Sequence, residues 1–256
     1  MTEIKPPNKM IIVEACVNSV TSAIEAEKGG ALRVELCDNL YEGGTTPSAA
    51  TIIITAQNIG IDLHVLIRPR GGDFLYSDFE FEVMKRDILF CKENGVKGVV
   101  LGILKDNADV DVDRTRELVE IASPMSVTFH RAFDMVFDPF KSLEDIITAG
   151  CHRILTSGFL NKAPDGLVLI EKMVNHAKGR IIIMAGSGIN HENAEVVVRY
   201  SGVKEIHASG RSSYPGKMKY KRSTIFMGGL PAIPEFEISQ TDSQKIKLIV
   251  QSVSKY

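Results

Sequence analysis

The chain has 256 residues, of which 44% are hydrophobic and 24% are charged, with a formal net charge of −2 at pH 7. This balance gives no general attraction to nucleic acids or to anionic membranes, and we expect the protein to bind neither. No apolar run approaches the roughly 20 residues that a membrane span needs. We expect residues 1–10 to form a flexible leader and residues 11–256 to form one domain.

Short β-branched runs alternate with helical segments along the chain. The expected strands are residues 11–16, 33–37, 63–67, 98–101, 126–129, 153–155, 180–184 and 205–208. The expected helices are residues 20–28, 48–58, 78–94, 111–122, 138–150, 167–176, 190–200 and 242–252, with an irregular segment at 211–239. Eight such units in about 250 residues predict an α/β fold, the TIM (β/α)8 barrel. A doubly wound sheet is the alternative, but no glycine-rich fingerprint follows the first strand.

Alternation along each strand separates a uniformly apolar face from a mixed face. Since the apolar face must meet the helices, the mixed face points into the barrel. This face carries Glu14, Arg33, Glu35, His64, Arg68, His130 and His207. Buried charges need partners, so we expect the two glutamates to pair with the two arginines. The set forms either an ionic plug or a functional site, and its place near the carboxyl ends of strands favours the site.

The pattern Glu-x-Cys ends two consecutive strands, at Cys16 and Cys37. Adjacent strands lie about 5 Å apart, so the two sulfurs can be neighbours. Two thiolates favour a soft ion such as Cu(I), or Zn(II) if His130 joins them. The alternative is that both cysteines are buried small hydrophobic residues, as we expect for Cys91 and Cys151. Four cysteines without a CxxC pair indicate free thiols and a cytoplasmic location.

Arginines and glycines at several strand ends suggest an anion site. Arg68 and Arg70 flank a proline before two glycines, and arginine binds carboxylates and phosphates. Arg131 follows His130, a candidate general acid or base that Asp134 or a strand glutamate would orient. Glycine-rich turns after the last two strands hold phosphate in many barrels, and the candidates there are Gly186, Gly188 and Ser209.

Eight stretches spread along the chain match one known family. They are residues 13–17 (VEACV), 34–37 (VELC), 42–48 (EGGTTPS), 67–77 (IRPRGGDFLYS), 128–134 (TFHRAFD), 155–158 (LTSG), 186–189 (GSGI) and 207–209 (HAS). With these stretches the chain resembles the CutC family of copper homeostasis proteins over nearly its whole length. The resemblance implies a cytoplasmic TIM barrel, commonly oligomeric, with Cu(I) bound at Cys16 and Cys37. Ser187 stands where a run of three glycines is expected.

Two main functions follow from these observations. The first is a cytoplasmic homeostasis protein that binds Cu(I) through Cys16 and Cys37, as a homo-oligomer (dimer or tetramer). The second is an enzyme for a small anionic metabolite, in which Glu14, Glu35 or His130 moves protons. A third is a scaffold that only supports partner contacts.

Overall fold

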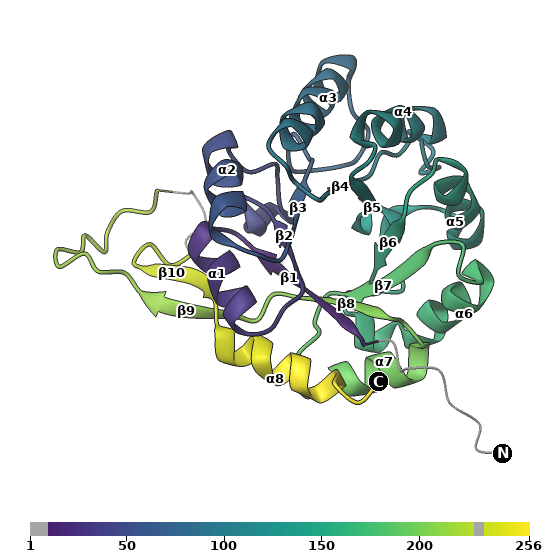
Figure 1. Cartoon of the computed structure of the whole chain (residues 1–256). Coiled ribbons are helices and arrows are strands. Elements are labelled where there is room, and N and C mark those ends of the chain that lie inside the picture. The colour runs from purple at the N-terminus through teal and green to yellow at the C-terminus, as the bar shows by residue number, and fades with distance from the viewer. Residues whose placement is uncertain (1–9, 228–232) are drawn as a thin grey trace.

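The computed structural model describes residues 10–227 and 233–256, and within them eight parallel strands close into a barrel surrounded by helices (Figure 1). The strands are β1 (Ile12–Val17), β2 (Arg33–Leu36), β3 (Asp62–Leu66), β4 (Gly98–Leu101), β5 (Ser126–Phe129), β6 (Arg153–Thr156), β7 (Ile182–Gly186) and β8 (Glu205–Ala208). Each strand pairs in parallel with the next, and β8 pairs with β1 to close the ring. The predicted TIM barrel is therefore confirmed.

One helix follows each barrel strand and packs on its outer side. The helices are α1 (Val20–Lys28), α2 (Ala49–Asn58), α3 (Asp78–Glu93), α4 (Val112–Ala122), α5 (Pro139–Thr148), α6 (Leu167–Ala177), α7 (Ala194–Ser201) and α8 (Ser243–Val253). Local capping explains most of their starts: Ser77 forms a reciprocal capping box with Glu80, and the Asp138 side chain caps α5 just before Pro139. No helix in the described ranges is long and apolar enough to cross a bilayer.

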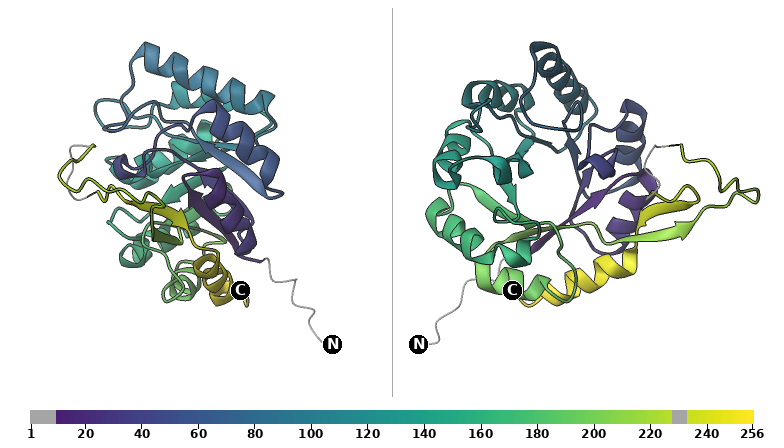
Figure 2. Two further views of the ribbon diagram at one scale, coloured as in Figure 1. Left: turned by 90° about the vertical axis from the view of Figure 1, so that its left-hand side faces the viewer. Right: turned by 180° about the vertical axis from the view of Figure 1, so that it is seen from behind.

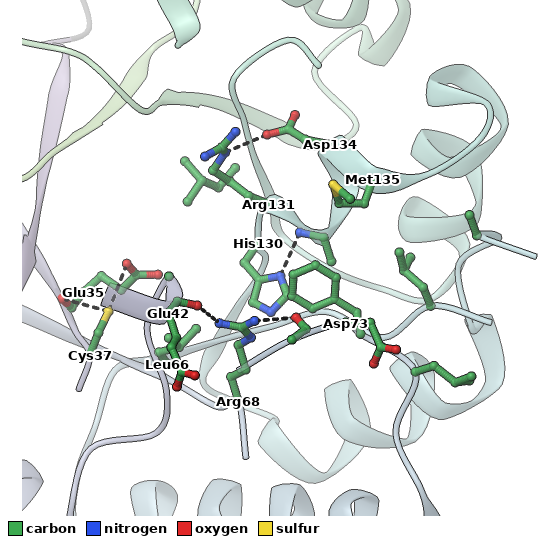
Figure 3. Close-up of a pocket in the computed structure, with 18 of the residues that line it drawn as sticks. Glu35, Cys37, Glu42, Leu66, Arg68, Asp73, His130, Arg131, Asp134 and Met135 are labelled. Atoms are coloured by element: carbon green, nitrogen blue, oxygen red, sulfur yellow. Dashed lines mark hydrogen bonds and ion pairs between the residues drawn. The ribbon is translucent and has the colours of Figure 1, made fainter. Parts of the chain in front are cut away.

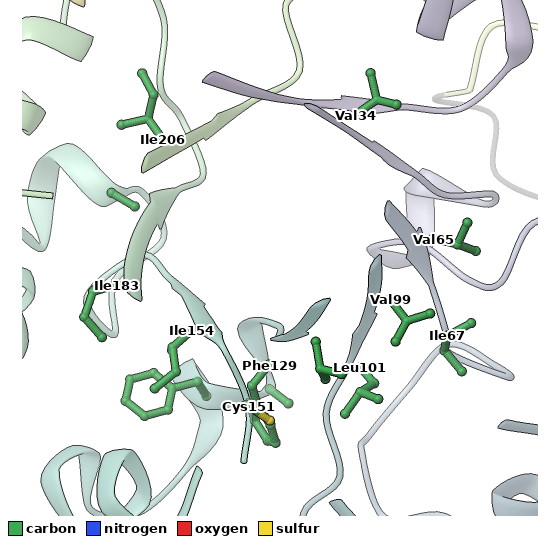
Figure 4. Close-up of a cluster of buried hydrophobic side chains, with 14 of the residues drawn as sticks. Val34, Val65, Ile67, Val99, Leu101, Phe129, Cys151, Ile154, Ile183 and Ile206 are labelled. Carbon is green, nitrogen blue, oxygen red and sulfur yellow. The ribbon is translucent and has the colours of Figure 1, made fainter. Parts of the chain in front are cut away.

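The main hydrophobic core lies between the strands and the helices. Figure 4 shows its outward-facing strand residues, among them Val34, Val65, Leu101 and Ile206, each with no exposed surface. Their neighbours in sequence face the barrel interior, as the alternation predicts. Every residue of the predicted mixed face is nearly buried, and His207 is the most open, with 12% of its side chain exposed.

Three local predictions need correction. The seventh strand is Ile182–Gly186 rather than residues 180–184, because Gly186 pairs with His207 of β8 and is not part of the following turn. The residues before α7 form a turn in which the Asn190 N–H donates to the side chain of Asn193. This helix therefore begins at Ala194, four residues after the predicted start at residue 190.

The segment expected to be irregular contains an antiparallel pair, β9 (Arg211–Pro215) and β10 (Glu237–Thr241). Figure 2 shows that this pair stands out from the side of the barrel, where β10 contacts α1. The predicted leader at residues 1–10 falls almost wholly outside the described residues.

Candidate functional site

The deepest charged layer of the barrel is a closed set of ion pairs, which we call the inner ion network (Glu14, Arg33, Arg153 and Glu205). Arg33 donates to both Glu14 and Glu205, so its predicted pairing with Glu14 is confirmed. Arg153 donates to both oxygens of Glu205, at 2.6 and 3.1 Å. Burial would raise the pKa of Glu14, but Arg33 and His207 outweigh it and hold that pKa well below its usual value. Glu14 is therefore charged at neutral pH.

One layer closer to the carboxyl ends of the strands lies the cysteine cluster (Cys16, Glu35 and Cys37). The two sulfurs are 4.0 Å apart, and the Cys37 thiol donates to a carboxyl oxygen of Glu35 at 3.3 Å. Donor atoms of all three residues lie within 4.8 Å of one another, which makes this a group that can hold a metal ion. The predicted proximity of the two cysteines is confirmed. The register of β1 with β2 brings them together, since Cys16 is the register partner of Glu35.

His207 links the cysteine cluster to the inner ion network. Its Nδ1 lies 2.7 Å from Glu14, and its Nε2 lies 3.6 Å from Glu35. Burial alone would lower the pKa of His207, but Glu35, Cys16 and Glu14 outweigh burial and raise that pKa well above its usual value. The histidine beside the thiols is therefore His207 and not His130. A signal for this existed, because closure of the barrel makes His207 the register partner of Glu14.

The two thiols differ in their affinity for a proton. The pKa of Cys16 lies well below its usual value, because the hydrogen bond from the Cys37 thiol and the neighbouring His207 together outweigh the opposing effect of burial. The same contact and burial raise the pKa of Cys37 well above its usual value. Burial raises the pKa of the Glu35 carboxyl to about 8. Cys37 therefore holds its proton more tightly than Cys16.

A cavity of about 770 Å³ opens above the cysteine cluster (Figure 3). Both cysteines, Glu35 and His207 lie along its surface, together with residues of the loops that follow β2, β3, β4 and β5. Its walls are largely apolar, with contributions from Leu66, Phe74, Leu104 and Leu155. Volumes of this order are typical of small-molecule sites.

Arg68 lines the cavity, but both terminal nitrogens of its guanidinium are already hydrogen-bonded, and only its buried Nε has no partner among the described residues. The guanidinium donates to the backbone carbonyls of Glu42, Gly44 and Gly72, each at 2.7 Å, and stacks on the Phe74 ring. The predicted pairing of Arg68 with Glu35 is therefore wrong, because the arginine instead fixes two loops at the barrel mouth. These carbonyls could not be assigned to Arg68 before the loop paths were known.

Arg70 does not line the cavity. Its guanidinium donates to Glu80 at 2.6 Å and to the carbonyls of Gly71, Asp73 and Leu75. Its N–H groups are thus used inside the loop before α3. The structure does not bring Arg70 together with the other candidates.

His130 and Arg131 both line the cavity, on the side away from the cysteine cluster (Figure 3). The Ala132 N–H donates to His130 Nδ1 at 3.1 Å, and this bond orients the ring. The prediction that Asp134 or a strand glutamate orients it is wrong. Burial and the charge of Arg68 lower the pKa of His130 to about 3, so the imidazole is neutral. Arg131 donates to Asp134 and to Ser157, both at 2.7 Å.

The predicted phosphate turn lies outside the cavity lining. A side chain at Gly186 would meet Leu155 at 2.5 Å, so this glycine allows close packing of β7 within the barrel. Gly188 has a φ of +71° and packs against Lys162, and the Ser187 hydroxyl donates to the carbonyl of Asn161 at 2.7 Å. The Ser209 carbonyl accepts from Thr241. None of the three predicted residues reaches the cavity.

Comparison with known proteins gives a consistent picture. The model of the CutC family matches residues 11–212. A mouse protein named copper homeostasis protein cutC homolog is 46% identical over 238 residues, which cover 93% of this chain and 88% of the mouse protein. A Parabacteroides distasonis protein named as a CutC family protein is 49% identical over 240 residues, 93% of this chain and 99% of its own length.

Solved structures give the same fold. The crystal structure of a CutC protein from Streptococcus agalactiae matches with a TM-score of 0.75 and 37% identity, covering 78% of this chain and 99% of the other. An aldolase called QR15 matches with a TM-score of 0.60 and 17% identity, covering 82% of this chain and 92% of its own. At that identity the aldolase shows a shared fold and nothing more.

Proposed function

Because this chain belongs to the CutC family, we propose that it serves copper homeostasis by binding Cu(I) through Cys16 and Cys37. The observation that carries the proposal is the 4.0 Å separation of the two sulfurs at the floor of a cavity. Two metal–sulfur bonds of about 2.3 Å each span that separation without rearrangement of the strands. Thiolates select soft ions, and Cu(I) is the soft ion of the first-row metals.

The neighbouring residues support this role. Cys16, with its lowered pKa, is ready to coordinate, whereas Cys37 must release its proton when the ion binds. Glu35 accepts the Cys37 proton in a hydrogen bond and supplies a third donor atom on the same side. His207, anchored by Glu14, places positive charge beside the thiolates.

The proposal includes a cytoplasmic location and self-association. All four cysteines are free thiols, which a reducing compartment maintains. Exposed apolar side chains on and after β9, including Tyr214, Met218 and Phe226, are consistent with a dimer or tetramer.

Titration of Cu(I) against a competing chelator tests the proposal. The double variant Cys16→Ser/Cys37→Ser is expected to lose Cu(I) binding, and Cys151→Ser, which changes a buried cysteine outside the cavity lining, serves as the control. Unchanged Cu(I) affinity in the double variant would contradict the proposal.

A second candidate is an enzyme that acts on a small anionic metabolite. The size of the cavity favours it, as do Arg131 and Lys105 in its lining. Of the predicted proton carriers, Glu35 fits best, because Glu14 is saturated by Arg33 and His207 whereas Glu35 has a pKa near 8. A thermal-shift screen of anionic metabolites tests it, with Arg131→Ala as the comparison. If every compound stabilises the wild type no more than it stabilises Arg131→Ala, this function is contradicted.

A further inference from the structure

The cavity is far larger than a metal ion requires. Its volume of about 770 Å³ lies in the range of sites for organic ligands, whereas an ion between the two sulfurs occupies only the floor. The cysteine cluster contributes Cys16, Glu35 and Cys37 to that floor, so an ion bound there is in contact with whatever fills the space above.

The protein offers this ion only two soft donors. In the described part of the chain, the third member of the metal-binding group is the carboxylate of Glu35, and a carboxylate oxygen is a hard donor that suits other metals better. The thioether of Met135 also belongs to the cavity lining, but Figure 3 shows it on the opposite side from Cys37. The 4.0 Å separation of the two sulfurs sets an S–Cu–S angle of about 120° for bonds of about 2.3 Å, which is the angle of three-coordinate and not of linear Cu(I), so the third position faces a ligand in the cavity.

The upper part of the cavity has the chemistry to hold such a ligand. Its lining includes the apolar side chains of Phe74 and Leu104 and groups of both charge signs, namely Lys105, Asp106 and Glu42. The Lys105 side chain is exposed, and no described carboxylate lies within ion-pair distance of its ammonium, because the nearby Asp109 is paired with Lys141. Apolar walls with separated positive and negative groups fit a zwitterion with a short organic body.

We infer that the cavity binds a thiol-bearing amino acid or short peptide whose sulfur completes the coordination of a Cu(I) ion held by Cys16 and Cys37. The inference rests on the proposed copper function and names the form in which the ion is exchanged. The ligand carboxylate lies at Lys105, its ammonium lies at Asp106 or Glu42, and its sulfur reaches the floor.

The exchange balances without oxidation or reduction. The ion arrives on two external thiolates, and Cys16 enters as a thiolate while Cys37 enters as a thiol. One external sulfur leaves and takes the proton of Cys37, so it departs as a neutral thiol. Copper stays Cu(I), with bonds to Cys16, Cys37 and the external thiolate that remains.

Co-retention of ligand and metal tests the inference. The full chain is loaded with Cu(I) in the absence of oxygen, with reduced glutathione or its S-methyl derivative as the probe, and passed through a desalting column. We expect about one glutathione per copper to be retained, no S-methyl derivative, and three sulfur neighbours of copper by X-ray absorption. Lys105→Glu is expected to weaken glutathione binding about fivefold, while Lys247→Glu, an exposed lysine on α8, matches the wild type.

The outcomes separate the inference from the proposed function. Copper retained with two sulfur neighbours and no glutathione would overturn the inference and leave the copper site intact. Equal retention of the S-methyl derivative, or of glutathione without copper, would also overturn it. Failure of the wild type to retain copper at all would overturn the proposed function, and the inference with it.

Discussion

Two layers of polar residues fill the same inward face of the barrel, and they differ in how fully their partners are satisfied. In the inner ion network, Arg33 bonds two carboxylates and Arg153 bonds both oxygens of Glu205. In the cysteine cluster, the sulfurs contact each other and Glu35 and lie open to a large cavity. The ionic plug, one of the two alternatives from the sequence, thus occurs in the deeper layer, and the functional site that we propose lies in the next layer. Soft donors that lie along a cavity distinguish the proposed site from the plug.

The largest effect is expected from breaking the inner ion network. Arg33→Met leaves the buried carboxylates of Glu14 and Glu205 without this partner, so the free energy of unfolding should fall by about 3–5 kcal/mol. Chemical denaturation measures this change. Arg86→Met, which removes an exposed pair with Glu82, is the control and should change stability by less than about 0.5 kcal/mol. A small effect at Arg33 would mean that this layer is not structural.

In the cysteine cluster, a substitution is expected to change Cu(I) affinity strongly and stability only slightly. Cys37→Ser replaces a soft ligand by a hard one, so Cu(I) affinity should fall at least roughly 100-fold. Its free energy of unfolding should change by about 1 kcal/mol or less, because the thiol makes only weak hydrogen bonds. Chelator competition and denaturation on the same samples measure both quantities. A stability loss as large as that of Arg33→Met would erase the distinction between the layers.

The proton on Cys37 gives the copper affinity a pH dependence. Because the pKa of Cys37 lies well above its usual value, the thiol is protonated near neutral pH and must lose its proton to bind. Cu(I) affinity should therefore rise with pH, by about tenfold between about pH 7 and about pH 8. Glu35, with a pKa of about 8, adds to the rise in the same direction. A flat or falling profile would show that Cys37 is not a ligand.

The smallest effect concerns the arginine that first suggested an anion site. Arg70→Ala removes bonds within the loop before α3 and should lower the free energy of unfolding by about 1 kcal/mol. Since Arg70 lies outside the cavity lining, Cu(I) affinity should not change. A clear loss of ligand binding in this variant would extend the site beyond the cavity.

Strand alternation predicted the fold and the contents of the barrel interior, because the two-residue period depends only on local sequence. It placed Glu14, Glu35 and His207 on the inward face, where the structure has them. The pairing of Glu14 with Arg33 followed from the need to satisfy a buried charge. The partner of Glu35 was not predicted correctly, because it depends on the stagger between strands and on loops that leave the sheet.

Loop geometry accounts for the rest. Arg68 binds carbonyls from two loops, and no sequence pattern indicates which carbonyls a loop will present. The pair β9–β10 was missed because its strands, such as Arg211–Pro215, are polar and lack the alternation that marks a half-buried strand. Gly186 resembled a turn residue, although it lies inside β7 to make room for Leu155.

The most direct test of the central claim is a crystal structure of the Cu(I)-loaded protein with anomalous data collected at the copper edge. The account predicts one strong anomalous peak between the Cys16 and Cys37 sulfurs, about 2.3 Å from each. A protein that binds copper with its peak elsewhere, and with these two thiols unchanged at 4.0 Å, would contradict the account.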